Sequence, residues 1–184
     1  MDVQAAARAI EDFLRALGRH PEHEPELAGT GERVARAWAE ELLDGYGVDV
    51  DALLAQNVFA GTSELVAVRD VPVTTICPHH LMPSTGRATV AFAPEEHLVG
   101  IGTLAQLVDA FAHRLATQEA TGERVVAAVQ KHLAPRWAGC RIVLEHACMS
   151  ARGGRSHGSR VETVALAGGE VDAAVAYAAL GVGR

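Results

Sequence analysis

The chain has 184 residues, of which 49% are hydrophobic and 21% charged, a balance typical of one globular domain with a sizeable core. Its net charge of −7 gives no electrostatic support to nucleic-acid binding. The sequence has neither a signal-like start nor the roughly 18 consecutive apolar residues of a membrane helix, so we expect a cytoplasmic protein. Two of its three cysteines lie in clusters with histidine, which favours metal binding over disulfides.

The first third of the chain is predicted to be helical. Apolar residues recur at helical spacing over residues 2 to 18, which indicates an amphipathic helix. The polar stretch 19–29 contains two prolines and predicts a linker, and a second helix follows from Thr30 to about Tyr46. We therefore expect residues 1–60 to form an N-terminal helical region.

The rest of the chain alternates between strand and helix patterns. Its β-branched and alternating segments predict strands at 64–76, 86–93, 139–149 and about 159–167. Helical periodicity predicts helices at 104–115, at about 121–133 and at 172–180. This order is typical of an α+β fold with an antiparallel sheet and a packed helix pair.

Two short clusters of cysteine and histidine are candidates for metal binding. Cys77 and His80 have C-x-x-H spacing, with His79 between them, and His146 and Cys148 lie two apart in a predicted strand, where they would share a face. Thiolates and imidazoles suit zinc; three protein ligands would leave a position for water, and four would close a structural site. With five candidates, the spacing leaves both open. The third cysteine, at position 140, is interpreted as a buried small apolar residue.

Motifs along most of the chain resemble GTP cyclohydrolase I, in the same order and over roughly residues 30 to 169. They are Thr30-x-x-Arg33, Val68-Arg69-Asp70, Cys77-x-His79-His80-Leu81, Gly86-Arg87-Ala88, Gly100, Gln118-Glu119 and His146-x-Cys148-x-x-x-Arg152-Gly153. The resemblance implies a tunnelling fold for residues 61–184, whose subunits join their sheets into a barrel. It also implies a homo-oligomer, a decamer of two pentameric rings.

The resemblance further implies a zinc ion held by Cys77, His80 and Cys148. A water bound to zinc has its pKa lowered to about 7, which suits hydrolytic attack at C8 of a purine. His79 would protonate the opening ring, and His146 would assist. In the family, GTP yields formate and dihydroneopterin triphosphate.

The pair Gln118-Glu119 is expected at the end of the first long helix of the second part of the chain, where such a pair is ordinarily solvated. The resemblance implies that it recognises guanine instead. A carboxylate can accept hydrogen bonds from N1–H and the 2-amino group, and an amide can serve the remaining edge. Adenine would leave Glu119 unpaired, which favours a 2-amino-6-oxo purine.

The positions that bind the triphosphate depart from the family pattern. Arg33 and Arg152 are retained, but Gly102, Thr103 and Gln106 replace a serine, a lysine and an arginine. Arg155 and Arg160 are possible replacements in the glycine-rich loop that follows. One alternative is therefore the same ring opening on guanine, guanosine or 8-oxoguanine. Another is a non-catalytic zinc protein of this fold, against which the retained His79 argues.

Overall fold

The computed structural model describes residues 1–169 and 172–183. Contacts within the chain divide it into two compact units, Met1–Asp44 and Gly45–Arg184, which are considered separately. Among the described residues, no helix has both the length and the apolar character needed to cross a bilayer.

The first unit is a pair of packed helices. Helix α1 (Val3–Ala16) begins at Asp2, whose carboxylate accepts a hydrogen bond from the Ala5 N–H at 2.9 Å. A 3₁₀ turn, Pro25–Leu27, lies in the predicted linker and leads to α2 (Thr30–Ala37), which packs against α1.

The predicted helix from Thr30 to Tyr46 is interrupted. After α2 the chain forms a π-helical turn at Trp38–Leu42 and a 3₁₀ turn at Asp44–Gly47. The second turn contains Gly45 and Gly47, and glycine is about 1 kcal/mol less favourable than alanine in a helix interior. The prediction of one continuous helix was therefore wrong beyond Ala37.

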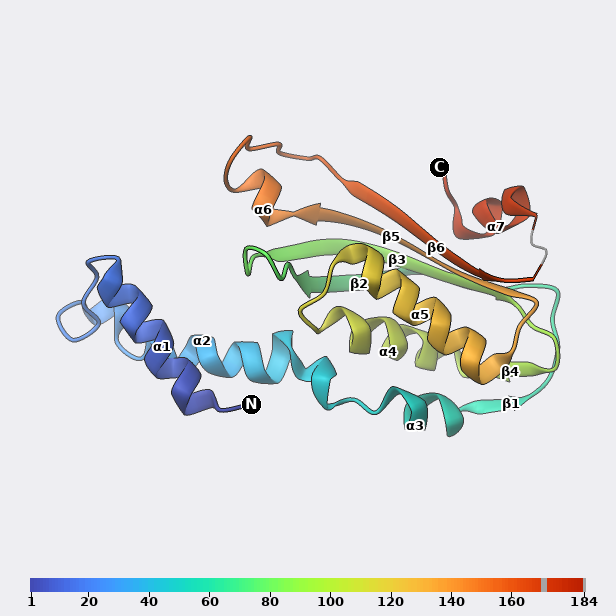
Figure 1. Cartoon of the computed structure of the whole chain (residues 1–184), viewed down its shortest axis with the longest axis horizontal. Coiled ribbons are helices and arrows are strands. Elements are labelled where there is room, and N and C mark those ends of the chain that lie inside the picture. The colour runs from blue at the N-terminus through green and yellow to red at the C-terminus, as the bar shows by residue number, and fades with distance from the viewer. Residues whose placement is uncertain (170–171, 184) are drawn as a thin grey trace. The chain divides into compact units, whose positions relative to one another are not determined.

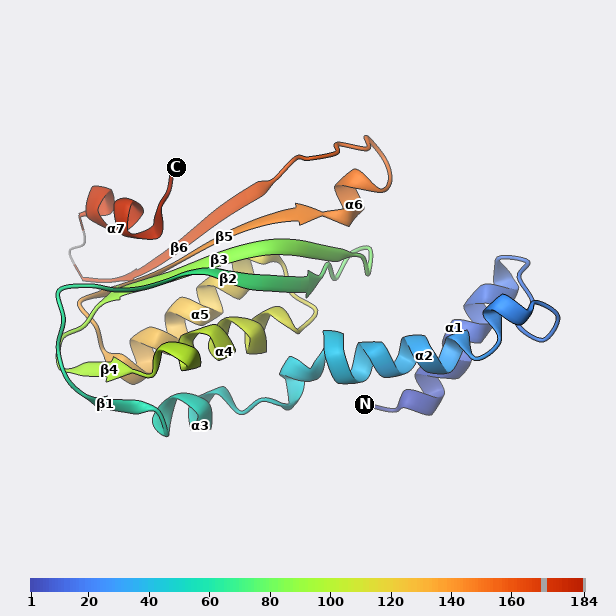
Figure 2. The ribbon, with the colours of Figure 1, turned by 180° about the vertical axis from the view of Figure 1, so that it is seen from behind.

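The second unit is built on a four-stranded antiparallel sheet in the order β2-β3-β5-β6. The strands are β2 (Val66–Ile76), β3 (Pro83–Ala93), β5 (Trp137–His146) and β6 (Val161–Gly168). Helices α4 (Ile101–Ala112) and α5 (Gln118–Leu133) cover one face, and α7 (Ala173–Leu180) packs on the other (Figures 1 and 2).

Both faces of the sheet are buried along the second half of β3. Val90 and Phe92 point into the main core beneath α4 and α5, whereas Ala91 and Ala93 pack with α7. Successive side chains of a strand point to opposite faces, so a strand covered on both sides is apolar throughout.

A short helix and a small second sheet complete the second unit. Helix α3 (Val50–Ala55) packs on α4 and α5, and β1 (Val58–Ala60) pairs with β4 (His97–Val99). All three belong to the second unit, although α3 and β1 fall within the predicted helical region 1–60.

Two element boundaries bear on the site. Helix α5 begins at Gln118 because the hydroxyl of Thr117 caps it, accepting from the Ala120 N–H at 3.3 Å. Gln118 and Glu119 thus start α5 instead of ending α4, contrary to the prediction. Strand β5 ends at His146 and a short helix, α6 (Ala147–Ser150), follows, so the strand predicted to reach residue 149 is shorter.

Candidate active site

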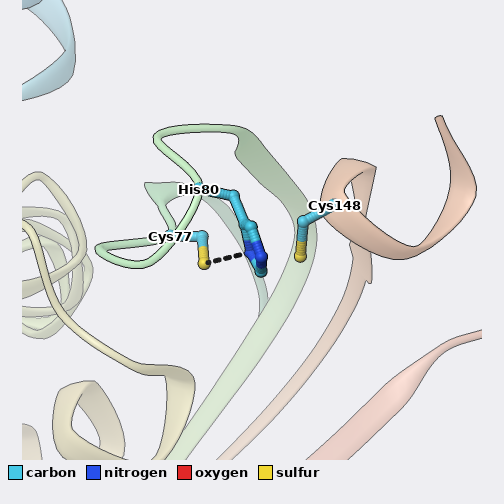
Figure 3. Close-up of side chains that lie close together, drawn as sticks. All are labelled: Cys77, His80 and Cys148. Carbon is cyan, nitrogen blue, oxygen red and sulfur yellow. Dashed lines mark hydrogen bonds between the residues drawn. The ribbon is translucent and has the colours of Figure 1, made fainter. Parts of the chain in front are cut away.

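A tight turn between β2 and β3 presents Cys77 and His80. Two backbone hydrogen bonds of 2.9 Å close it: the Cys77 N–H donates to the carbonyl of Met82, and the Leu81 N–H donates to the carbonyl of Cys77. The turn also needs a positive φ of 53° at Leu81. The Cys77 sulfur consequently lies 3.8 Å from Nδ1 of His80 (Figure 3).

The third thiol comes from a different kind of element than the sequence pattern suggested. Cys148 lies in α6, so it does not share a strand face with His146. The antiparallel pairing of β3 with β5 sets Ser84 opposite His146, which places α6 beside the turn. One ligand atom each of Cys77, His80 and Cys148 lies within 4.8 Å of the others (Figure 3).

This donor set fits zinc chemically. Two thiolates and one imidazole are ligands that zinc prefers, and three protein ligands leave one position open. Burial raises the pKa of the Cys148 thiol, and the neighbouring Cys77 sulfur raises it further, whereas the positive charge of Arg152 lowers it. A divalent cation would offset the repulsion between the two thiolates.

His146 is held at both ring nitrogens. Its Nδ1 lies 2.8 Å from Oγ of Ser84, and its Nε2 lies 2.8 Å from Oε1 of Gln118. Burial lowers the pKa of His146, and the negative charge of Glu119 opposes that effect. The arrangement thus suits a neutral imidazole.

The amide of Gln118 decides which nitrogen of His146 carries the proton. Its Nε2 donates to the carbonyls of Ile142 at 2.8 Å and Val161 at 3.0 Å, and to Oγ1 of Thr163 at 3.1 Å. Carbonyls only accept, so Oε1 of Gln118 must be the acceptor that faces the imidazole. The neutral His146 ring therefore donates from Nε2 and accepts the Ser84 proton at Nδ1.

A pocket of about 260 Å³ joins these groups. The predicted residues that line it are Cys77, His79, His80, Gln118, Glu119, His146 and Cys148. Glu119 and His79 are exposed side chains, whereas Gln118 is only 4% exposed, its amide bonded within the protein. Thr75 and Ser84 also line the pocket. Sequence reasoning missed these two because a hydroxyl residue in a strand is a common feature, and only the strand register brings them to the site.

The predicted phosphate-binding residues do not line this pocket. Arg152 is exposed in the loop after α6. Arg33 belongs to the first unit, where its guanidinium donates to the carbonyl of Ala28 at 2.8 Å and to Oγ1 of Thr30 at 3.0 Å. The three residues that replace polar family positions all lie on α4, where Thr103 is buried and Gly102 and Gln106 are exposed.

Comparison with known proteins agrees with the motifs. The family model of GTP cyclohydrolase I matches residues 6–179. The GTP cyclohydrolase 1 of Bartonella bacilliformis is 37% identical over 91% of this chain and 82% of its own length. That of Nitrosospira multiformis is 40% identical over 91% of this chain and 90% of its own length. Among solved structures, the archaeosine synthase QueF-Like in the apo form covers 60% of this chain at a TM-score of 0.48 and 18% identity.

The match to the family covers nearly the whole chain, and it confirms the α+β tunnelling fold that the motifs implied. With this coverage and this level of identity, the chain belongs to the GTP cyclohydrolase I family and, with it, to the hydrolases that act on cyclic amidines.

Proposed function

We propose that this chain is a zinc-dependent cyclohydrolase that opens the imidazole ring of a guanine-type purine at C8. The observation that carries the proposal is the convergence of Cys77, His80 and Cys148 in the pocket that Glu119 also lines. Family membership supports the reaction type, and the donor set supports the metal.

The three metal donors and His79 have separate tasks in this proposal. Cys77, His80 and Cys148 hold the zinc, which when bound supplies a water with a pKa near 7. His79 lies at the exposed turn, with Nδ1 3.9 Å from the Cys77 sulfur. It donates a proton to the ring nitrogen that is released when the C8 bond breaks, a general-acid role that histidine often fills.

Glu119 recognises the base. It is exposed in the first turn of α5 and lines the pocket, where its carboxylate accepts from the N1–H and 2-amino groups of guanine. A contact between Gln118 and the guanine edge stays a prediction. In the structure its amide is bonded to His146 and to the sheet, which supports a role in holding the pocket.

The site has few residues that could bind the phosphates of a nucleotide. Arg33 and Arg152 are the retained phosphate-binding candidates, whereas Gln106 has no charge and Thr103 is buried. A charge-assisted phosphate contact is worth roughly 1.5–3 kcal/mol, so two missing cations matter for a triphosphate. We therefore propose that GTP is a poor substrate compared with a less phosphorylated guanine derivative.

The test is formate release by the zinc-loaded protein from GTP, guanosine and guanine under one set of conditions. We expect kcat/KM to be higher for guanosine or guanine than for GTP. Glu119→Ala should lose most of the activity on every substrate, whereas Glu123→Ala, one turn later on the exposed side of α5, should not. A clear preference for GTP would mean that the phosphate clamp has been rebuilt, with Arg33, Arg152, Arg155 and Arg160 as the candidate residues. Neither formate nor a ring-opened product from any purine would favour the non-catalytic zinc protein.

We also propose that the chain assembles into a homo-oligomer, by its family a decamer of two rings. The four-stranded sheet supports this because it ends in β2 on one side and β6 on the other. Strand edges with unpaired backbone groups are the places where sheets of different subunits join.

A further inference from the structure

Thr75 carries a buried hydroxyl that has no hydrogen-bond partner. Its side chain is 3% exposed, and within the described part of the chain Thr75 Oγ1 is the buried side-chain polar atom left unbonded. Buried polar groups nearly always find partners, and an unpaired one costs free energy. Thr75 lines the pocket with the metal donors, so a bound molecule is within reach of this side chain.

The fold alone gives no reason for a hydroxyl at this position. Thr75 follows Val71 and Val73 on the same face of β2, and both valines are buried in the main core. Valine has nearly the same shape as threonine and a similar preference for strands, but it lacks the oxygen. A valine at position 75 would keep the packing and remove the unpaired group. On this face of β2, the threonine stands at the position that lines the pocket, whereas Val71 and Val73 do not line it.

The neighbours of Thr75 are already bonded. Thr75 pairs in register with Ser84, and Ser84 pairs with His146 on β5, so the three side chains form a row across one face of the sheet. Ser84 and His146 bond to each other at 2.8 Å, and Gln118 bonds to the far side of the imidazole. Thr75 is the one member of this row whose hydrogen-bonding capacity is unused in the described structure.

We propose that Thr75 Oγ1 is a further substrate-binding group, which donates its proton to an in-plane lone pair of the bound purine. Such a lone pair is offered by a ring nitrogen or the 6-oxo oxygen. The assignment rests on the proposed function, because it takes the purine as the occupant of the pocket. Thr75 lies on β2, two residues before Cys77 in the turn that follows the strand. We therefore expect it to contact the part of the purine nearest the metal donors, whereas Glu119 contacts the purine from α5.

The experiment compares Thr75→Val and Thr75→Ser in the full-length, zinc-loaded protein. KM is measured from formate release, and Kd by calorimetry, each for GTP and guanosine. Thr75→Val should raise both constants about 2- to 10-fold, the worth of one neutral hydrogen bond. Thr75→Ser keeps the hydroxyl and should restore the wild-type values to within about twofold. Thr89→Val is the control, because Thr89 is a buried threonine of the same sheet that does not line the pocket.

Zinc content and Tm separate a binding role from a structural one. Since Thr75→Val removes an unpaired buried polar group, it should keep its zinc and melt at or above the wild-type Tm. Loss of zinc or a lower Tm would overturn the assignment in favour of structural support. Unchanged KM and Kd, with Glu119→Ala still inactive, would overturn it while leaving the proposed function intact. A wild-type protein that neither binds nor cleaves GTP, guanosine or guanine would overturn both.

Discussion

His79 and His146 line the same pocket but differ in what their nitrogens can do. Both nitrogens of His146 are within 2.8 Å of a protein partner, Ser84 on one side and Gln118 on the other. His79 is exposed at the turn, where its Nδ1 lies 3.9 Å from the Cys77 sulfur and its ring lies edge-on to that of His80. A general acid needs a nitrogen that the substrate can reach, which is why we propose His79 for the proton transfer.

Replacing His79 by alanine should therefore leave zinc bound and slow the reaction. We expect a loss of roughly 10²–10⁴ in kcat, the usual contribution of a general acid–base group. Elemental analysis and steady-state kinetics on the same sample check this. His157→Ala, in the exposed loop after α6, should behave as wild type. A His79→Ala protein that purifies without zinc would show instead that His79 is a ligand.

The three cysteines have distinct environments. Cys140 is fully buried on β5, and burial raises its pKa to about 12, so it stays a neutral, unreactive thiol at physiological pH. Cys77 and Cys148 are partly exposed, and their sulfurs belong to the donor cluster. The interpretation of Cys140 as a small buried side chain agrees with this burial.

Cys148→Ala should remove zinc, because two donors hold the ion less well than three. We expect about one zinc per chain in the wild type and a large loss of metal and activity in the variant. Cys140→Ala is the matched control: it deletes a sulfur from the same stretch of chain, outside the cluster, and should keep the metal. Full zinc occupancy in Cys148→Ala, measured by elemental analysis, would show that the ligand set is different.

At the scale of elements, the start of α5 connects the helix layer to the sheet. Gln118 is the first residue of the helix, and its amide donates to backbone carbonyls of both β5 and β6 while its oxygen accepts from His146. One buried side chain thus fixes the helix, two strands and the histidine relative to one another. Such a fully bonded buried group is costly to truncate, because its partners are left unpaired.

Gln118→Ala should accordingly lower the free energy of unfolding by about 2–4 kcal/mol. Gln130→Ala, near the other end of α5, deletes a single donated bond of 2.9 Å to the Ala167 carbonyl and should cost about 1 kcal/mol. Urea unfolding at one protein concentration compares the two. Equal losses would mean that the network around His146 contributes little beyond one hydrogen bond.

The sequence pattern predicted which elements exist better than where they end. Helical and alternating periodicity located α4, α5 and the four sheet strands, because these faces are buried. It did not locate the helix cap at Thr117. It also missed the change from strand to helix after His146, because two residues spaced like His146 and Cys148 can occur in a strand or at a strand-to-helix junction. The cluster of Cys77, His80 and Cys148 was expected from the family motifs, because spacing alone left five candidate ligands. The bonds of Gln118 and the position of Thr75 depend on strand register, which a single sequence does not specify.

At the scale of the whole molecule, the sheet has open edges. Strand β2 is 11 residues long and lies at one edge of the four-stranded sheet, and β6 lies at the other. A register shift between Val68 and Val71 interrupts β2, a bulge of the kind that limits uncontrolled edge pairing. In the proposed homo-oligomer, edges of this length would pair with a second copy in a defined register.

Assembly has a consequence for catalysis that can be measured. In the family the residues that match Arg33 and the zinc donors meet across subunits, and here Arg33 lies in a separate unit from the donors. With GTP as substrate, Arg33→Ala and His79→Ala chains should each be weak as homo-oligomers. Co-assembled in equal amounts, they should recover activity at about one quarter of the sites, where an intact His79 meets an intact Arg33 from its neighbour.

Arg36→Ala mixed with His79→Ala is the control, because Arg36 forms a 2.7 Å ion pair with Glu32 on its own helix. Sedimentation of a fully active monomer, or no recovery on mixing, would contradict a site shared between subunits.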